Sequence, residues 1–445
     1  MNPGFAAPPA TPAYTLADAT VALCLVDAPA LAADRDGLCR VDIRVENGTI
    51  ASVLPAGADA GGSALPILDL GGGMVFPRFT EAHTHLDKGH IWPRRRNPDG
   101  TFLGALSNVT ADREANWNAA DVRARMDFAL RCALAHGTGA IRTHLDSVGP
   151  QIGISWPVFA ELRAEWAGRI ALQASPLFGI DHAVSASHVE AVVEAVKAHG
   201  SGILGAVTYM SPNLEPGLDV LFRAAIDNGF DLDFHVDETN DPAALSLEVI
   251  ADTALALGFQ GRILCGHCCS LALQMPQAEA RVIDKLARAG IAVVSLPMCN
   301  MYLQDRQAGR TPRWRGVTLL HELKAAGVEV MVASDNTRDP FYAYGDLDMI
   351  EVYREATRMI QLDHGDTDWL RAVTVTPASV TRLDGGAQLA NPIAIGRPAD
   401  LVLTRARSMT ELLSRPHSDR TVLLAGKAID TTLPAYAELD HLMNR

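Results

Sequence analysis

The middle of the chain alternates short apolar runs with longer stretches in which apolar residues recur at helical spacing. This alternation is typical of a parallel sheet whose strands are joined by crossover helices. Eight short runs fall within residues 74–333, which is the size of a (β/α)8 barrel. The structural alternative is an open doubly wound sheet, but such sheets carry a glycine-rich phosphate loop after the first strand, and this sequence has none there. The predicted strands are Met74–His83, Gly139–His144, Ile170–Ser175, Ile203–Thr208, Leu232–His235, Ile263–His267, Ile291–Leu296 and Val328–Ala333.

Both ends of the chain have shorter apolar runs, which are broken by Gly, Asp and Asn. Residues 41–45 alternate apolar and polar side chains, and the turn Asn47-Gly48 follows, so we predict a β-hairpin. Similar short strands return at residues 396–404 and 421–429. Because so few strands bury little area at either end alone, we expect one sandwich built from both ends. The predicted organisation of this α/β protein is a flexible tail at 1–15, a β-sandwich from 16–73 and 387–445, and a distorted (β/α)8 TIM barrel at 74–386.

Composition excludes several classes of protein. The chain has 445 residues, of which 48% are hydrophobic and 20% are charged, so it is not a largely disordered chain. Its net charge of −14 argues against binding to nucleic acid or to a membrane surface, because both present phosphates that attract a basic face. No apolar run of about 18 residues occurs, and no basic residue precedes the first apolar segment, so we expect neither a spanning helix nor a signal peptide. The 7 cysteines have no disulfide-framework spacing, which favours a cytoplasmic protein.

Residues that bind metals or move protons follow several of the predicted strands directly. In a parallel barrel the carboxyl ends of the strands share one face, and the chemistry of such folds takes place there. His83 and His85 are separated by one residue, so their side chains point the same way from a strand end. Any one of these histidines alone could be an ordinary core residue, but their concentration at strand ends predicts a common site. The strand ends carry His83, His85, His144, Asp146, His235, Glu238, His267, Asp335 and Asn336.

These motifs resemble those of the amidohydrolase superfamily, and within it those of the bacterial cytosine deaminases. The resemblance extends from about residue 18 to residue 430. It implies a metal-dependent hydrolytic deaminase, an aminohydrolase that acts on a small amino-substituted N-heterocycle. The matching motifs are Glu81–Asp87, Arg142–Asp146, Asp233–Asp241, Gly266-His267, Asn300–Gln304, Arg315-Gly316 and Ser334–Tyr342.

The resemblance implies one divalent metal ion, zinc or iron, since nitrogen and oxygen ligands suit both. The implied ligands are His83, His85, His235 and Asp335. Such an ion lowers the pKa of bound water to about 7 and so supplies hydroxide at neutral pH. The fourth strand ends in Gly205–Tyr209, without the lysine that the family's binuclear members use.

The same analogy assigns proton transfer to nearby side chains. Glu238 is expected to carry protons between the water, the ring and the departing amine, as in other nucleobase deaminases. His267 is expected to orient the hydroxide, and Asp335 to take its proton as well as bind the metal. Asp87 and Asp146 are expected to orient the imidazoles from outside the ligand set.

The substrate-facing positions depart from the cytosine deaminase pattern. Leu177 and Phe178 stand about where that family has a glutamine that recognises the pyrimidine edge. Asn336 replaces a second aspartate, and Phe341 replaces a tryptophan. A site that reads a base through hydrogen bonds discriminates strongly, so we predict that the reaction is retained and that the substrate is altered.

Arg338 replaces an apolar residue and suggests that the substrate carries a carboxylate or another anionic group. A pair between Arg338 and Asp339, or a loop carbonyl, is the alternative. Lys88 and the run Arg94–Arg96 are expected to form a solvated loop at the rim of the site.

We therefore expect a small heterocyclic substrate, no nucleic-acid or membrane partner, and, from the resemblance, a homo-oligomer. The alternative function is hydrolysis of a cyclic amide or imide C–N bond, as in dihydroorotases and hydantoinases. The missing lysine and the presence of Glu238 argue against it. A catalytically inactive binding protein is a third possibility, which the intact set of ligand residues disfavours.

Overall fold

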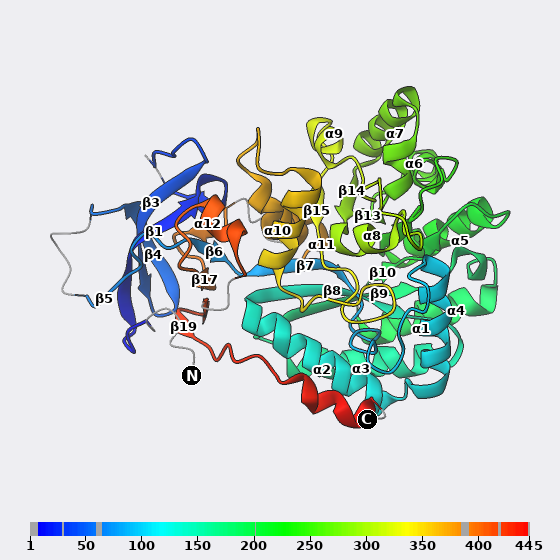
Figure 1. The fold of residues 1–445 in the computed structure, drawn as a ribbon, viewed down its shortest axis with the longest axis horizontal. Coiled ribbons are helices and arrows are strands. Elements are labelled where there is room, and N and C mark those ends of the chain that lie inside the picture. The colour runs from blue at the N-terminus through cyan, green and yellow to red at the C-terminus, as the bar shows by residue number, and fades with distance from the viewer. Residues whose placement is uncertain are drawn as a thin grey trace. The chain divides into compact units, whose positions relative to one another are not determined.

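The structure is a computed structural model that describes residues 8–28, 31–58, 65–200, 202–383, 391–416 and 420–443. The chain divides into two compact units (Figure 1). The first contains Met1–Thr80, Arg131–Ala140 and Asp348–Leu433, and the second contains Glu81–Leu130, Ile141–Leu347 and Pro434–Arg445. None of the described helices is long and apolar enough to span a membrane.

The first unit contains sheets built from both ends of the chain. One sheet has the order β4 (Thr49–Pro55), β3 (Leu38–Glu46), β1 (Ala13–Ala22) and β5 (Ile67–Asp69). A second sheet has the order β19 (Lys427–Ala428), β18 (Thr421–Leu424), β17 (Leu401–Leu403) and β6 (Val75–Pro77). A third pairs β16 (Ile393–Ala394) with β2 (Val26–Asp27). β1 begins at Ala13, inside the predicted tail, because its first residues pair with β3; residues 1–7 lie outside the described part of the chain.

The predicted hairpin is confirmed. β3 and β4 pair antiparallel and are joined by Asn47 and Gly48, whose φ angles are 49° and 80°. Positive φ at both central residues defines the turn that matches the twist of two adjacent strands. A Cβ atom at Gly48 would lie 2.7 Å from the carbonyl oxygen of Ala425, so this position also requires glycine for space.

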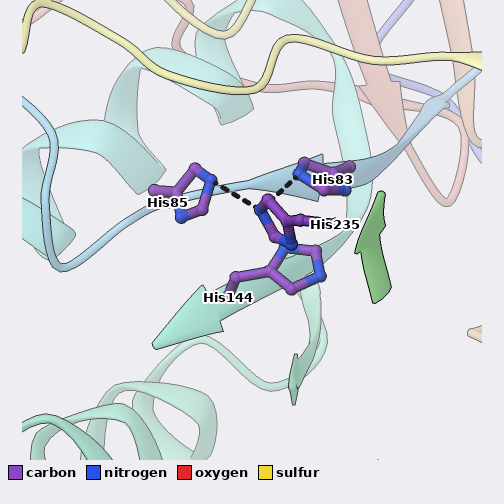
Figure 2. A group of neighbouring side chains, drawn as sticks. All are labelled: His83, His85, His144 and His235. Atoms are coloured by element: carbon purple, nitrogen blue, oxygen red, sulfur yellow. Dashed lines mark hydrogen bonds between the residues drawn. The ribbon is translucent and has the colours of Figure 1, made fainter. Parts of the chain in front are cut away.

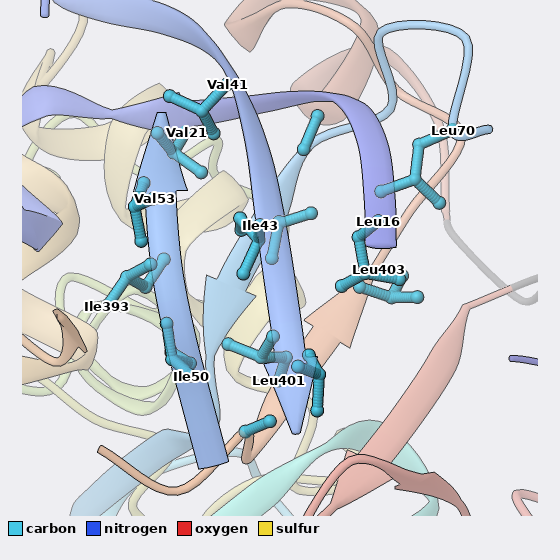
Figure 3. Close-up of a cluster of buried hydrophobic side chains, with 14 of the residues drawn as sticks. Leu16, Val21, Val41, Ile43, Ile50, Val53, Leu70, Ile393, Leu401 and Leu403 are labelled. Carbon is cyan, nitrogen blue, oxygen red and sulfur yellow. The ribbon is translucent and has the colours of Figure 1, made fainter. Parts of the chain in front are cut away.

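The apolar residues of both chain ends bury one another (Figure 3). Leu16 and Ile43 from the N-terminal strands belong to the same buried cluster as Ile393, Leu401 and Leu403 from the C-terminal strands. All five are exposed by 1% or less. The alternating pattern at each end therefore supplies one half of a common core.

The remaining long strands form a (β/α)8 barrel-like ring, as predicted. The ring consists of β7 (Phe79–Thr84), β8 (Thr138–Asp146), β9 (Ala171–Leu177), the pair β10 (Ile203–Leu204) and β11 (Val207–Thr208), β12 (Asp231–Val236), β13 (Ile263–His267), β14 (Ile291–Ser295) and β15 (Val330–Val332). Neighbouring strands are parallel from β10 to β15. Parallel bridges from Gly179 to Val207 and from Thr84 to Asp335 join the remaining edges.

Helices follow most of these strands. They are α1 (Phe102–Asn116), α2 (Ala119–His136), α3 (Ile152–Glu165), α4 (Ala186–His199), α5 (Leu214–Asn228), α6 (Ser246–Leu257), α7 (Pro276–Ala289), α8 (Pro297–Leu303), α9 (Leu320–Ala325), α10 (Met349–Ile360), α11 (Val375–Thr381) and α12 (Met409–Ser414).

Two predicted strands are each divided in the structure. The run Met74–His83 becomes β6 and β7, which belong to different sheets, and the break follows Pro77. The fourth barrel strand is divided at Gly205, where an added Cβ would lie 1.8 Å from the carbonyl oxygen of Asp233. The backbone of β12 approaches so closely that no side chain fits at this position.

A buried ion pair in the first unit gives a stability prediction. The Asp348 carboxylate accepts hydrogen bonds from Arg420 at 2.8 and 2.6 Å and caps α10 through the amide of Ile350 at 2.9 Å. Burial would raise the pKa of Asp348, but Arg420 and His136 outweigh it and hold the pKa well below its usual range. Asp348→Asn is expected to lower the free energy of unfolding at pH 7 by about 3–5 kcal/mol, because it leaves the Arg420 charge buried without its partner.

The pH dependence of unfolding in urea tests this assignment. A carboxyl whose pKa is depressed in the folded protein stabilises it above the unfolded pKa of about 4, and this stabilisation is lost as the pH falls. The difference between wild type and Asp348→Asn should therefore shrink below about pH 4. Asp219→Asn, which removes an exposed pair with Arg223 on α5, is the control and should change little. A constant difference from pH 7 to pH 3 would contradict the role of this carboxylate.

Candidate metal and proton-transfer site

Histidines from three strands converge at one end of the barrel (Figure 2). His83 lies in β7 and His85 directly after it, and the period-two alternation of a strand places both rings on one side. His235, in β12, points its Nε2 atom at both, 3.1 Å from Nε2 of His83 and 3.3 Å from Nε2 of His85. All three side chains are buried.

Asp335 completes this group from the loop after β15. Its Oδ1 atom lies 3.1 Å from Nε2 of His85 and 3.6 Å from Nε2 of His83. The Asp335 amide donates to the carbonyl of His83 at 2.9 Å, and the Thr84 hydroxyl donates to the carbonyl of Asp335 at 2.7 Å. The buried Glu81 carboxylate adds a further link, since it accepts the amide hydrogens of His83 and of Ser334. The backbone therefore holds Asp335 against β7.

The four donor atoms have the spacing of one metal coordination shell. In a tetrahedral shell with ligand distances of about 2.0–2.2 Å, neighbouring donors lie about 3.4 Å apart. The distances of 3.1–3.6 Å among His83, His85, His235 and Asp335 match this spacing. Burial and the neighbouring imidazoles lower the pKa of His83 and His235 well below its usual value, so both rings are neutral and each has one ring nitrogen free to bind a metal.

Unsatisfied atoms support the same interpretation. Both carboxylate oxygens of Asp335 are buried, and neither has a hydrogen-bond partner among the described residues. A buried carboxylate surrounded by neutral imidazoles is costly without a cation beside it. The cluster therefore fits one divalent ion.

His144, which the sequence analysis placed at a strand end without assigning it a role, joins this cluster. Its ring centroid lies 4.1 Å from that of His83 and 4.6 Å from that of His235. Its Nε2 atom is 3.1 Å from Asp233 Oδ1, and Arg142 donates to the other oxygen of Asp233 at 2.9 Å. A signal for this residue was present, because Thr-His-Leu-Asp occurs at 84–87 and again at 143–146.

Glu238 and His267 form a second pair of polar groups close to the cluster. Glu238 Oε1 lies 3.6 Å from Nδ1 of His267, and the Asn300 amide contacts both side chains, at 3.4 Å and 2.9 Å. Burial, and after it the charge of Asp335, raises the pKa of Glu238 well above its usual value, so this carboxyl keeps its proton to a higher pH than an exposed glutamate does. Burial lowers the pKa of His267 to about 3, so its imidazole is neutral.

Two site residues have left-handed backbone conformations. His267 and Asp335 have φ angles of 68° and 63°. Such angles are uncommon outside glycine and cluster at sites where the surrounding structure must aim a side chain.

The sequence analysis was wrong about Lys88, which is buried. Its Nζ atom lies 3.6 Å from Asp146 Oδ1 and 5.0 Å from the centroid of the Phe341 ring. Burial lowers the pKa of Lys88, but Asp146, Asp339 and other carboxylates outweigh it and raise the pKa above its usual value. The Lys88 ammonium group is therefore charged, and the nearby carboxylates balance its charge.

Arg94 is also buried, in contrast to the predicted solvated rim. Its side chain is 4% exposed and pairs with Asp112 and Asp121. These counter-charges lie on α1 and α2, so the local sequence around Arg94 does not reveal them. Arg95 is half-buried, and Arg96 is exposed as predicted.

Asp87 and Asp146 have different partners from those predicted. Asp87 Oδ2 accepts the amide of Asp146 at 2.9 Å and the hydroxyl of Ser155 at 2.8 Å. Asp146 pairs with Lys88 and, at 2.7 Å, with Arg113. Their observed partners are thus amide, hydroxyl and cationic groups, where we expected imidazoles.

The predicted substrate-facing residues lie in two places. Leu177 and Phe178 are buried at the end of β9, and the Phe178 ring packs edge-on against His188 of α4 at 4.7 Å. Asn336 and Phe341 are organised by Asp339, which accepts the Asn336 side-chain amide at 2.6 Å and the Phe341 backbone amide at 2.7 Å.

The guanidinium of Arg338 stacks on an aromatic ring, 4.0 Å from the centroid of Tyr436. This ring is none of the three partners considered from sequence, which were an anionic substrate, Asp339 and a loop carbonyl. Its predicted role in substrate binding stays a prediction.

A cavity of about 200 Å³ borders Glu238. Its lining includes Phe102 at the start of α1 and Gln304 at the end of α8. Glu238 therefore faces a cavity and also approaches the cluster, since one of its carboxylate oxygens lies within 4.8 Å of a carboxylate oxygen of Asp335.

Comparisons with known proteins agree with the sequence resemblance. A family model described as "Amidohydrolase family" matches residues 163–429. The chain is 54% identical over 441 residues to a pterin deaminase from Rhizobium rhizogenes, and the match covers 99% of each chain.

Solved structures show the same fold. A 5-methylcytosine deaminase from Klebsiella pneumoniae superposes with a TM-score of 0.78 at 24% identity, over 93% of this chain and 97% of that one. An N-isopropylammelide isopropylaminohydrolase from Burkholderia multivorans superposes with a TM-score of 0.72 at 25% identity, over 94% of this chain and 98% of that one.

Proposed function

Because the chain belongs to the amidohydrolase family and is a hydrolytic deaminase of an N-heterocycle, we propose that it releases ammonia from the exocyclic amino group of a pterin. The observation that carries this proposal is the 54% identity to a pterin deaminase over 99% of both chains. A pterin is a fused two-ring heterocycle whose amino group sits on a carbon between two ring nitrogens, so its hydrolytic deamination is the reaction type expected from the sequence.

We propose that His83, His85, His235 and Asp335 hold the metal ion, and that the ion is zinc or iron. When bound, it lowers the pKa of water enough to supply hydroxide near neutral pH. The spacing of the four donor atoms and the unpaired oxygens of Asp335 support this ligand set. Metal analysis of the purified protein decides between zinc and iron.

We propose that Glu238 is the proton carrier. Its raised pKa keeps a proton available, which it can donate to the ring nitrogen beside the amino-bearing carbon. Protonation makes that carbon more electrophilic, and the same carboxyl group can then relay a proton to the departing amine. The neutral His267, held by Asn300, is placed to orient the attacking oxygen, and Asp335 to accept its proton.

Ammonia release from metal-loaded protein tests the substrate. We expect kcat/KM for pterin to exceed that for cytosine by about 100-fold or more, since a polar pocket built for one ring rejects another. Substituted pterins, 5-methylcytosine and N-isopropylammelide complete the panel, and for N-isopropylammelide the released isopropylamine is measured in place of ammonia. Turnover of cytosine without turnover of pterins would overturn the proposal, and hydrolysis of cyclic imides without ammonia release would favour the alternative function.

We also propose the remaining organisation of the protein: a β-sandwich from residues 16–73 and 387–445, a barrel from 74–386, and a cytoplasmic homo-oligomer. The common core of the two chain ends supports the sandwich. Light scattering during size-exclusion chromatography tests the oligomer.

A further inference from the structure

Beside the histidine cluster, two carboxyl groups and a thiol lie close together. Glu238, Cys299 and Asp335 each contribute one donor atom, and these atoms all lie within 4.8 Å of one another. They come from the loop after β12, from α8 and from the loop after β15. Cys299 is 0% exposed, Asp335 is 1% exposed and the Glu238 side chain is 10% exposed. The deamination proposed above uses the two carboxyl groups but not the thiol, whose other contacts are long ones to Asn336 Oδ1 at 3.7 Å and to the carbonyl of Phe341 at 3.8 Å.

The spacing of these atoms suits a metal ion after a small adjustment. Metal–sulfur distances of about 2.3 Å and metal–oxygen distances of about 2.0–2.2 Å place the donors of one ion within about 4.5 Å of one another. The Asp335 carboxylate has two buried oxygens without hydrogen-bond partners among the described residues. Oδ1 lies next to His85, so the carboxylate can bind the first ion with one oxygen and a second ion with the other.

We propose that Glu238, Cys299 and Asp335 form a second divalent metal site that takes a thiophilic ion such as Zn²⁺, and that occupation of this site inhibits deamination. Thiolate ligands favour zinc-type ions over magnesium or manganese. The thiol releases its proton to solvent as the ion binds. Glu238, one of the three ligands, borders a cavity of about 200 Å³.

Inhibition follows from the identity of the ligands. A metal-bound Glu238 can neither donate nor accept a proton, and the second ion also occupies space beside the reacting atoms. This part rests on the proposed function, whereas the binding of a second ion does not.

Metal titration of the full-length protein tests the site. Wild type carrying one ion is titrated with Zn²⁺, and bound metal and ammonia release are measured at each step; Cd²⁺ titration adds the ultraviolet absorbance of a thiolate–metal bond. We expect a second bound ion, a thiolate absorbance and falling activity. In Cys299→Ala the affinity for the second ion should fall by about 100-fold or more. Loss of a group that only orients a metal ligand already lowers affinity by about 10- to 100-fold, and Cys299 is proposed to be a ligand itself. The thiolate absorbance should disappear, and activity should persist at the Zn²⁺ concentration that inhibits wild type.

Matched variants separate this site from other thiols and from misfolding. Cys132→Ala removes a buried thiol of α2 outside the group and should behave as wild type. Cys299→Ser keeps the size of the side chain and should also lose the thiolate absorbance. Mg²⁺ should neither bind at this site nor inhibit.

The proposal is wrong if wild type binds only one ion, or if Cys299→Ala and Cys299→Ser keep the thiolate absorbance or the zinc inhibition. If the protein deaminates no heterocycle, the stoichiometry and the absorbance still decide whether the second site exists. Failure of the proposed function and failure of this inference are therefore distinguishable.

Discussion

Glu238→Gln is expected to lower kcat for deamination by about 10²–10⁴-fold, which is the usual contribution of a positioned acid–base group. The amide has the same shape but cannot release or take up a proton at neutral pH. Because Glu238 is not one of the four proposed metal ligands, the variant should retain its ion, and KM should change less than kcat. Steady-state kinetics with metal analysis of the same preparations measures both effects.

The pH profile distinguishes proton transfer from a structural defect. If the protonated carboxyl is the active form, kcat/KM of wild type falls as the pH rises through the raised pKa of Glu238. Glu238→Gln should lose this dependence. Glu215→Gln, on the exposed surface of α5, is the control and should match wild type. A Glu238→Gln enzyme that retains most of its kcat would exclude Glu238 as the proton carrier.

Loss of the metal is expected to have the largest effect. Without an ion the pKa of water returns from about 7 to about 15.7, so we expect chelation, or His235→Asn, to lower kcat/KM by at least about 10⁴-fold. His235 approaches both His83 and His85, so its loss removes the central donor of the cluster. Added Zn²⁺ or Fe²⁺ should restore the chelated wild type but not His235→Asn.

An exposed histidine provides the control for this experiment. His182→Asn should bind metal and turn over substrate as wild type does, because His182 lies in an exposed 3-10 turn. Full activity of metal-free wild type would refute the metal-dependent mechanism, and metal retained by His235→Asn would refute the assigned ligand set.

The main elements of the barrel and the histidine cluster were predictable because both depend on local pattern. Apolar runs mark the strands, and chemistry-bearing residues follow the strand ends, where a parallel barrel brings them together. The break at Gly205 was not predictable, because it depends on the approach of the Asp233 carbonyl from the neighbouring strand.

The burial of Lys88 was missed for a related reason. Its compensating charges are Asp146, the last residue of β8, and Asp339, in the loop after β15. Both are far from Lys88 in the sequence, so the residues next to Lys88 gave no sign that its charge would be buried and compensated. The same holds for Arg338, whose aromatic partner Tyr436 is remote in sequence. The departures from the cytosine deaminase motifs were enough to infer an altered substrate. The residues that line the pocket could not be inferred, because they are brought together by contacts between residues far apart in the sequence.

The core shared by the two chain ends has a consequence for biosynthesis. β1, β3 and β5 leave the ribosome first, but Ile393, Leu401 and Leu403, which cover their apolar face, are made roughly 320 residues later. At about 5–20 residues per second this delay lasts tens of seconds. During translation the nascent N-terminal sheet therefore presents an uncovered apolar face and free edges, which makes it a natural client for chaperones that bind growing chains.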